Sequence, residues 1–232
     1  MKLSVIFSTF NEEKNQFFNE SLELLSKYQE IEIIIIDYHS TDKTSEIAAS
    51  ANAIFKLSSS NSRGKRLDEG LRLSTAPLIL FHHPRSKLQA SGVEYLLKDK
   101  NLLWGGFDHK FDSRSILLSF TSWYSNNVRA DIREIFYLDH CIYCTRDLMK
   151  RIGGFPHDSI FEDTEVSLKL RDIASSKRLP YQSMTSSIRF KTNGEWRQAI
   201  LNQVMKVCYY LKIDQEKMNK IYEFGLNLNS RY

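Results

Sequence analysis

The regular alternation of strand-like and helix-like segments in the first half of the chain is the strongest constraint on its fold. Residues 33–36 are four consecutive isoleucines, which is typical of a strand buried on both faces. Alternation of this kind predicts an α/β domain whose central sheet is mostly parallel and flanked by helices. We expect strands at 3–7, 31–37, 53–57 and 77–82, and helices at 14–28, 40–51 and 61–74.

The second half of the chain is less regular, but it contains no repeat or low-complexity linker that would divide it from the first. We therefore expect one domain over residues 1–232. The pattern predicts a bent strand at 102–112, a helix at 115–132, strands at 135–145 and 179–190, an acidic helix at 161–174, and C-terminal helices at 194–214 and 215–226.

The composition is that of an ordinary globular protein, with 42% hydrophobic and 26% charged residues. A formal net charge of +4 does not by itself indicate a nucleic-acid partner, although it suits an anionic ligand or contact with an anionic membrane. The three cysteines are too few and too odd in number for a disulfide scaffold. They favour a reducing, cytoplasmic location.

Polar side chains follow three of the expected strands, where α/β proteins place their ligands. Asn11 and Glu12 follow the first strand and are able to hydrogen-bond a sugar or a base edge, although Asn11 alone also suits a helix cap. Asp37 ends the isoleucine-rich strand, so its carboxylate is delivered to the sheet edge, where it suits a ribose hydroxyl or a base N–H. The third loop contains two histidines, His82 and His83, followed by Pro84 and Arg85.

Two further motifs place charges at expected helix starts. Arg63 lies in NSRGKR, which is not a phosphate-binding P-loop but brings a guanidinium within reach of a diphosphate; a solvated basic helix turn is the alternative. Glu162 and Asp163 open the acidic helix, either as partners of the helix dipole or as a general base for an incoming hydroxyl.

Five motifs, in this order, resemble a glycosyltransferase of family 2 with the GT-A fold: STFNEE, IIIIDYHSTDKT, SRGKRLDEGLRLSTAPLILFHH, WGGFD and GGFPHDSIFEDTEVSLKLR. The likeness is greatest to a small bacterial branch with a His-Ala-Asp type strand end and a late Trp-Arg helix, here GEWRQAIL. The resemblance implies transfer of a sugar from a nucleotide-diphospho-sugar to an acceptor hydroxyl, with the chemistry of an inverting enzyme. It further implies a nucleotide-binding half at 1–90, an acceptor and catalytic half at 91–192, and C-terminal helices at 193–232.

The same resemblance assigns roles to individual residues. Asp163, with Glu162 beside it, matches the acidic pair that supplies the base. The donor-binding positions are Asn11, Glu12, Asp37, Arg63, His83 and Arg85, and the acceptor-side positions are Trp104, Asp108 and Trp196.

In the family pattern, an Asp-x-Asp-like motif holds Mn²⁺ or Mg²⁺ against the diphosphate. This chain departs from the pattern at that motif. Arg85 stands in place of the metal-binding Asp, and an arginine has no lone pair with which to bind a metal. We hypothesise that Arg85 replaces the charge of the metal. Two alternatives are a metal held by His82, His83 and Asp163, and an inactive nucleotide-sugar-binding protein. Tyr38 and His39 also depart from the family pattern, so the identity of the donor's nucleobase stays open.

Two further interpretations concern class and partners. A nucleotidyltransferase shares the layered α/β sheet but requires a glycine-rich phosphate loop, which STFNEE lacks. The helix at 194–212 is amphipathic, with Arg197, Lys206 and Lys212 on its polar side. It either packs on the core or rests on a membrane beside a lipid-linked acceptor; a soluble glycan is the other acceptor class.

Overall fold

The computed structural model describes residues 1–157, 160–214 and 217–218. The helix predicted at 215–226 lies almost entirely outside the described residues. The strands are β1 (Leu3–Thr9), β2 (Ile31–Asp37), β3 (Ile54–Leu57), β4 (Leu78–His82), β5 (Ser86–Leu88), β6 (Trp104–Phe111), β7 (Ile142–Thr145) and β8 (Lys177–Thr185). The helices are α1 (Gln16–Leu25), α2 (Thr44–Ser50), α3 (Arg63–Leu73), α4 (Ala90–Lys98), α5 (Ile116–Tyr124), α6 (Arg146–Arg151), α7 (Glu162–Arg171), α8 (Ile188–Asn193) and α9 (Glu195–Tyr210), with a π-helical turn η1 (Ser125–Ala130) and a 3₁₀ turn η2 (Leu138–His140).

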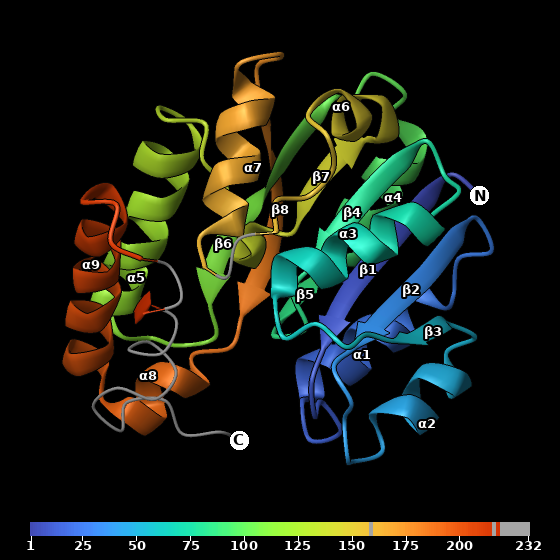
Figure 1. Cartoon of the computed structure of the whole chain (residues 1–232), viewed down its shortest axis with the longest axis horizontal. Coiled ribbons are helices and arrows are strands. Elements are labelled where there is room, and N and C mark those ends of the chain that lie inside the picture. The colour runs from blue at the N-terminus through green and yellow to red at the C-terminus, as the bar shows by residue number, and fades with distance from the viewer. Residues whose placement is uncertain (158–159, 215–216, 219–232) are drawn as a thin grey trace.

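The strands form one sheet in the order β3-β2-β1-β4-β7-β6-β8-β5 (Figure 1). β3, β2, β1 and β4 are parallel, which confirms the prediction from the alternating first half. In the second half β6 and β8 are parallel, whereas β7 is antiparallel to both β4 and β6, and β5 is antiparallel to β8. The sheet is therefore mixed rather than uniformly parallel.

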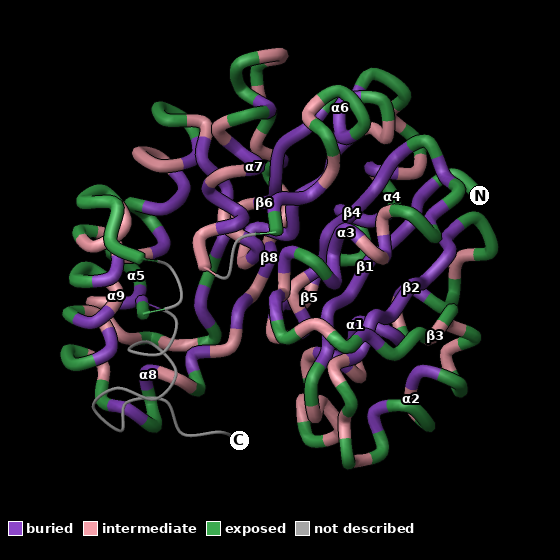
Figure 2. Tube along the Cα trace, viewed as in Figure 1, coloured by how far each residue is buried: buried purple, intermediate pink, exposed green. Residues whose placement is uncertain are grey.

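Two hydrophobic clusters cover the two faces of the sheet, and the central strands are buried throughout (Figure 2). Along β2, Ile33 and Ile35 belong to one cluster and Ile34 and Ile36 to the other, as the alternation of side chains in a strand requires. Helices α1 and α4 pack on the first face, and α3, α6 and α7 on the second (Figure 1). This explains why β2 reads as an unbroken apolar run.

Two of the predicted strands are shorter in the structure than in the sequence analysis. The strand predicted at 179–190 ends at Thr185, because its ladder partners β6 and β5 offer no residue beyond Phe111 and Ser86, and residues 188–193 form α8 instead. The strand predicted at 135–145 begins only at Ile142. Its earlier part is turned away from the sheet and hydrogen-bonds to α7.

Two predicted helices also change. The helix expected at 40–51 begins at Thr44, because Ser40 and Asp42 hydrogen-bond to neighbouring loops rather than leading directly into the helix. The helix expected at 115–132 is α-helical only to Tyr124 and continues as the π-helical turn η1. The helix predicted at 194–214 is confirmed as α9, which packs beside α5 through Leu118 and Ala199.

Candidate active site

The parallel register of β1, β2 and β4 brings the three polar loops predicted from the sequence to one edge of the sheet. Asn15 links two of these loops, because its side-chain nitrogen donates to Glu12 Oε2 at 2.7 Å and to the carbonyl oxygen of Pro84 at 3.1 Å. Asn15 also caps α1 by accepting from the backbone of Phe17 and Phe18. The capping role considered for Asn11 therefore belongs to Asn15.

Asp37 is fully buried at the end of β2. Its Oδ2 accepts from the hydroxyls of Thr9 at 2.7 Å and Ser40 at 2.6 Å, and its Oδ1 accepts from the backbone nitrogen of Ser40 at 2.7 Å. In this conformation the carboxylate holds the loop that follows β2. Its contact with a ribose or a base stays a prediction.

Asn11 and Glu12 lie beside that loop. Asn11 has a left-handed backbone, with φ of 54°, and its Oδ1 accepts from the backbone nitrogen of Thr41 at 2.9 Å. Burial raises the pKa of Glu12, an effect opposed by the hydrogen bond from Asn15 and by the charge of Arg85. Glu12 and Arg85, two predicted donor-binding residues, therefore lie within electrostatic reach of each other.

Arg66 is a buried cation at this edge that the sequence analysis did not select. Its Nε donates to Ser8 Oγ at 2.7 Å, and its guanidinium carbon lies 5.5 Å from the centre of the Tyr38 ring. Burial and the charge of Arg63 lower the pKa of Arg66 to about 10. The sequence did contain a signal for Arg66. It lies three residues after the candidate Arg63, and residues i and i+3 of a helix lie on one face.

The acidic pair and Arg63, predicted separately, form one cluster. Glu162 and Asp163 are 1% and 6% exposed at the start of α7. Arg63 Nε donates to Glu162 Oε1, and its Nη2 lies 3.7 Å from Asp163 Oδ2. The carboxylates of Glu162 and Asp163 outweigh burial and raise the pKa of Arg63, so the guanidinium is charged.

Asp163 has the surroundings of a proton acceptor. Its Oδ2 accepts from the backbone nitrogen of Leu138 at 3.1 Å, and its Oδ1 from that of Thr164 at 2.8 Å. Burial and the negative charge of Glu162 raise the pKa of Asp163 to about 6, against the opposing charge of Arg63. A carboxylate with a pKa near the working pH is the kind of group that accepts a proton effectively in general base catalysis.

Two glycines bring α3 close to the segment that leads into α7. A β-carbon at Gly64 would lie only 2.0 Å from the carbonyl oxygen of Pro156, and one at Gly154 would lie 2.4 Å from Asp68 Oδ1. Asp68 accepts from the backbone nitrogen of Phe155 at 3.1 Å. Close backbone packing of this kind holds Arg63 against the acidic pair.

His82 and His83 differ in their surroundings at the end of β4. His82 is 2% exposed and packs on the Phe7 ring with a centroid distance of 4.7 Å. His83 Nδ1 accepts from the backbone nitrogen of Arg85 at 3.0 Å. Burial lowers the pKa of His82 to about 4 and that of His83 to about 3, so both rings are neutral at pH 7.

The charges of Arg63, Arg85, Arg189 and Asp139 all act on His83. Arg189 and Asp139 are missing from the sequence-based site, because both fell in segments predicted to be strands but lie instead in α8 and η2. Burial opposes ionisation of Asp139, but its electrostatic interactions with neighbouring groups, His83 first and then His109 and Arg63, lower its pKa. The end of β4 is thus surrounded by three guanidinium groups and one carboxylate.

The described residues do not assemble a complete protein site for the divalent ion that the family resemblance implies. No group of three or more His, Cys, Asp or Glu residues that could hold a metal forms in residues 1–157, 160–214 and 217–218. The alternative set of His82, His83 and Asp163 is therefore not assembled as a metal site. The group that occupies the expected ligand position is the Arg85 guanidinium, which offers no lone pair.

The three acceptor-side predictions fall in three different environments. Trp104 is fully buried, and its Nε1 donates to the carbonyl oxygen of Ala174 at 2.6 Å, so it packs the core and does not line an acceptor site. Asp108 forms an ion pair with Arg178. Trp196 is 70% exposed at the start of α9.

Comparisons with known proteins bear on the fold and on the first third of the sequence. Residues 4–84 match the family model described as glycosyl transferase family 2. Among solved structures, Staphylococcus aureus TarS 1-349 is 19% identical, with a TM-score of 0.63 over 98% of this chain and 71% of that one. The mannosyltransferase PcManGT from Pyrobaculum calidifontis is 16% identical, with a TM-score of 0.63 over 98% of this chain and 70% of that one.

Glucosyl-3-phosphoglycerate synthase from Mycobacterium tuberculosis is more distant, at 14% identity and a TM-score of 0.56 over 79% of this chain and 70% of that one. The comparison with curated proteins gives no match. The described chain has the GT-A fold of glycosyltransferases, and its first third carries the family 2 sequence pattern. The GT-A fold predicted from the sequence is thereby confirmed.

Proposed function

We propose that the chain transfers a sugar from a nucleotide-diphospho-sugar to an acceptor hydroxyl, with inversion at the anomeric carbon. The observation that carries the proposal is Asp163, buried beside Glu162 and Arg63 near the carboxyl ends of the parallel strands. The similar structures support this donor class, because TarS was solved with UDP-GlcNAc and with UDP, and PcManGT with GDP-Man and Mn²⁺. UDP-sugars and GDP-sugars are therefore the donors to test first.

Asp163 is the proposed base. Arg63 engages Glu162 through its Nε, and the charge of Glu162 helps to raise the pKa of Asp163 to about 6. The ionised Asp163 would accept the proton of the acceptor hydroxyl as that oxygen attacks the anomeric carbon. A positioned base of this kind typically contributes about 10²–10⁴-fold to the rate.

Arg85 and Arg189 would stabilise the negative charge that develops on the departing diphosphate. Both lie close enough to His83 for their charges to lower its pKa, after the larger effect of burial. A hydrogen bond to a charged group contributes about 1.5–3 kcal/mol, so two such contacts supply about 3–6 kcal/mol. A divalent ion at a leaving group contributes several kcal/mol, which is a comparable amount. We therefore propose transfer that does not depend on a metal.

The test is release of nucleoside diphosphate from a panel of UDP- and GDP-sugars, measured with a chelator present, for the wild type and for Asp163→Asn. The proposal expects release by the wild type and strong loss in the variant, with donor affinity measured by calorimetry unchanged. The anomeric configuration of the product, determined by NMR, tests inversion. Equal binding with no release by either protein, across all donors and acceptors tried, would favour the inactive binding protein.

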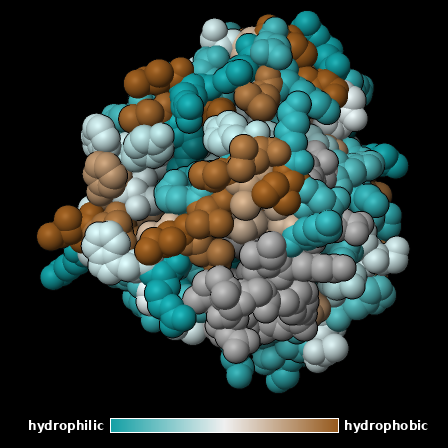
Figure 3. Space-filling model, turned by 60° about the vertical axis from the view of Figure 1, so that its left-hand side comes forward, coloured by the Kyte–Doolittle hydropathy of each residue, from teal (hydrophilic) through white to brown (hydrophobic). Residues whose placement is uncertain are grey.

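A membrane contact is also proposed, through a face that we call the α5–α9 face. On α9 the residues opposite the buried Leu201 and Met205 are apolar and exposed, which differs from the polar side expected from the sequence. Hydrophobic side chains gather on this side of the molecule in Figure 3. The α5–α9 face consists of Ile116, Phe120 and Trp123 on α5, and Trp196, Ile200, Val204 and Val207 on α9, each 48–88% exposed.

We propose that this face rests on the surface of an anionic bilayer. Phe120 and Trp123 stack at a centroid distance of 5.8 Å, and aromatic rings of this kind favour the membrane interface. Among the described residues, no helix has the length and hydrophobicity needed to cross a membrane. The proposed contact is therefore peripheral.

Co-sedimentation with phosphatidylcholine–phosphatidylserine vesicles tests the contact. The triple variant Phe120→Ser, Trp123→Ser and Ile200→Ser should partition much less than the wild type, while light scattering follows the oligomeric state of both. Equal partitioning of the two proteins contradicts the membrane proposal. A wild-type dimer that the triple variant converts to a monomer would assign the face to a second copy of the chain.

A further inference from the structure

A pocket of about 230 Å³ lies between η1, α9 and the start of α7, beside the proposed active site. Its wall includes Thr164, which follows Asp163, and Tyr137, which precedes the Leu138 nitrogen that hydrogen-bonds Asp163. A molecule whose hydroxyl reaches Asp163 would therefore have its neighbouring groups at the mouth of this pocket.

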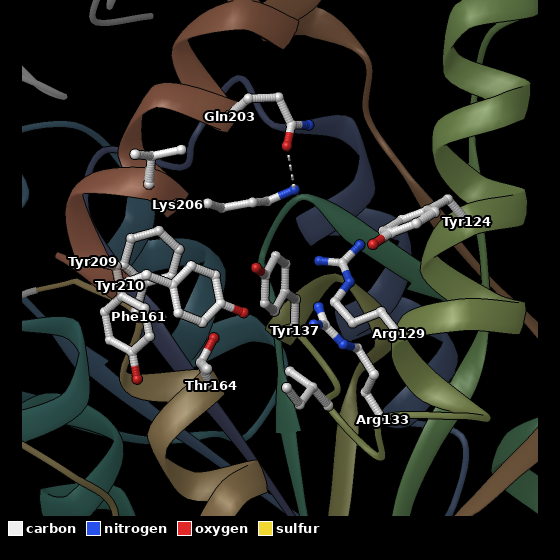
Figure 4. A pocket seen from close by; sticks show the side chains of 12 residues that line it. Tyr124, Arg129, Arg133, Tyr137, Phe161, Thr164, Gln203, Lys206, Tyr209 and Tyr210 are labelled. Carbon is white, nitrogen blue, oxygen red and sulfur yellow. Dashed lines mark hydrogen bonds between the residues drawn. The ribbon is translucent and has the colours of Figure 1, made fainter.

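Three cations converge on the pocket from two sides. Figure 4 shows Arg129 and Arg133 reaching in from one side and Lys206 pointing from α9 toward them. The lining residues include no aspartate or glutamate. The nearby Glu165 already accepts a hydrogen bond from the Tyr209 hydroxyl, and in the described part of the chain no carboxylate pairs with any of the three cations.

Arg129 shows that the pocket is prepared for an anion. Its Nη2 donates to Ser125 Oγ, and its guanidinium carbon lies 3.7 Å from the centre of the Tyr137 ring. Its Nε is buried and has no hydrogen-bond partner among the described residues. A buried donor without a partner is unfavourable for the fold, and an anion bound beside the Arg129 guanidinium would stabilise its charge.

Lys206 adds a second indication. Burial and the charge of Arg129 lower the pKa of Lys206 to about 8, because two cations face each other here without a balancing carboxylate. The other titratable or charged residues that line the pocket are Arg133, Tyr124, Tyr137, Tyr209 and Tyr210. An anion bound between Lys206 and Arg129 would remove this repulsion.

We propose that the pocket binds a phosphate or phosphodiester group carried by the acceptor. Cations with several donors in a concave, partly buried site are suited to phosphate oxygens. The assignment of the phosphate to the acceptor rests on the proposed function, whereas the anion site itself does not. The source is either a soluble phosphorylated acceptor or the headgroup of a lipid, since Tyr124, Val207 and Tyr210 of the pocket are at least 36% exposed beside the α5–α9 face.

The experiment follows binding of inorganic phosphate to the whole chain by ¹H–¹⁵N NMR, at pH 7. The double variant Arg133→Gln, Lys206→Gln removes two pocket cations and leaves Arg129 in its hydrogen bond. The matched control, Arg114→Gln with Lys169→Gln, changes the net charge equally at two exposed positions outside the pocket. Arg85→Gln reports on phosphate bound at the end of β4.

The proposal expects chemical-shift changes at the pocket residues and an affinity about 10- to 100-fold weaker in the double variant, the equivalent of one or two charged contacts. The control and Arg85→Gln should stay within about twofold of the wild type. Absence of phosphate binding by the wild type overturns the proposal, and so does binding lost in Arg85→Gln but kept in the double variant.

The source of the phosphate is tested with glycerol 3-phosphate and with phosphatidylcholine vesicles containing phosphatidic acid. Binding that depends on Arg133 and Lys206 in the first arm supports a soluble acceptor, and in the second a lipid headgroup. If binding depends on Arg133 and Lys206 in neither arm, the proposal is overturned. Nucleotide-sugar binding is also measured on the wild type and on the double variant, which separates the anion site from the proposed function. Absence of donor binding by the wild type and by every variant would refute the proposed function and leave the anion site standing.

Discussion

Replacement of Asp163 by Asn removes the proposed base with almost no change in shape. Without a positioned base the rate should fall by about 10²–10⁴-fold, equivalent to about 2.7–5.5 kcal/mol in the activation barrier. The fall should appear in kcat, since the bound donor makes its contacts with other residues. Donor affinity should therefore stay within about threefold of the wild type, or less than 1 kcal/mol.

The effect of Asp163→Asn on stability follows from its surroundings. The amide removes a buried charge that lies beside Glu162, which stabilises the fold. The Asn side chain also loses one of the two hydrogen bonds that Asp163 accepts from the backbone nitrogens of Leu138 and Thr164, because one of its groups is now an NH₂ donor. This loss destabilises the fold by about 1–3 kcal/mol. These opposing terms are similar in size, so the melting temperature should move by only a few degrees.

The pH dependence of Asp163→Asn supplies a second check. The wild-type kcat/KM should rise as pH increases through about 6, because the base acts when deprotonated. The apparent value belongs to the coupled Glu162–Asp163 pair. Because folding raises the pKa of Asp163, its protonated form favours the folded state, and this contribution to stability is lost as pH rises through about 6. The Asn variant should therefore gain stability relative to the wild type as pH rises from about 4 to about 6, and the difference should level off above that range.

The assay is release of nucleoside diphosphate from the best donor of the panel, with binding followed by calorimetry. Asp172→Asn, an exposed carboxylate at the end of the same helix, is the matched control and should keep full activity. Turnover by Asp163→Asn within about threefold of the wild type would refute the assignment of the base, as would an unchanged acidic limb in its pH profile.

Three further predictions concern other parts of the molecule. Arg85→Ala should weaken nucleoside diphosphate binding by about 10- to 100-fold in calorimetry, the loss of one charged contact, and an unchanged affinity would remove Arg85 from the donor site. Gly64→Ala should lower stability by about 1–3 kcal/mol in urea unfolding and reduce turnover, because the new β-carbon would lie 2.0 Å from the Pro156 carbonyl oxygen. Lys65→Ala, at an exposed position on the same turn, is the control and should change neither stability nor turnover. Phosphate binding at the pocket should weaken as pH rises through about 8, where Lys206 loses its charge, and Lys206→Gln should abolish that dependence; a wild-type affinity that is flat from pH 7 to 9 would contradict it.

The sequence predicted the first half of the fold well because periodicity and burial point to the same elements there. The isoleucines of β2 are buried on both faces, and the loops after β1, β2 and β4 meet at one edge as expected. The second half depended on strand partners that local patterns do not reveal. Residues 138–140 and 188–190 fall in segments that were predicted as strands, but neighbouring strands are absent at those positions among the described residues, and both lie in helical turns.

The same limitation applies to the site. Asp163, Glu162 and Arg63 were identified from helix starts, but only the close packing at Gly64 brings them together. Arg189 was hidden in a segment predicted as strand, and Trp104 was selected for its type although its side chain fills the core. Site residues could therefore be predicted from the sequence where the helix or strand that carries them was correctly predicted. They were missed where tertiary contacts determine the secondary structure.

Arginines at the end of β4 are proposed to replace the metal of the family pattern. The most direct test is thermal unfolding of the wild type with UDP, GDP and their sugars, each with manganese and with a chelator. A ligand at about 100 times its Kd stabilises a protein by about 2.7 kcal/mol, which for a chain of this size shifts the melting temperature by about 5–10 °C. We expect a nucleotide to give the same shift with the chelator as with manganese, and Arg85→Gln to lose most of that shift. Stabilisation that appears only with manganese would contradict the account.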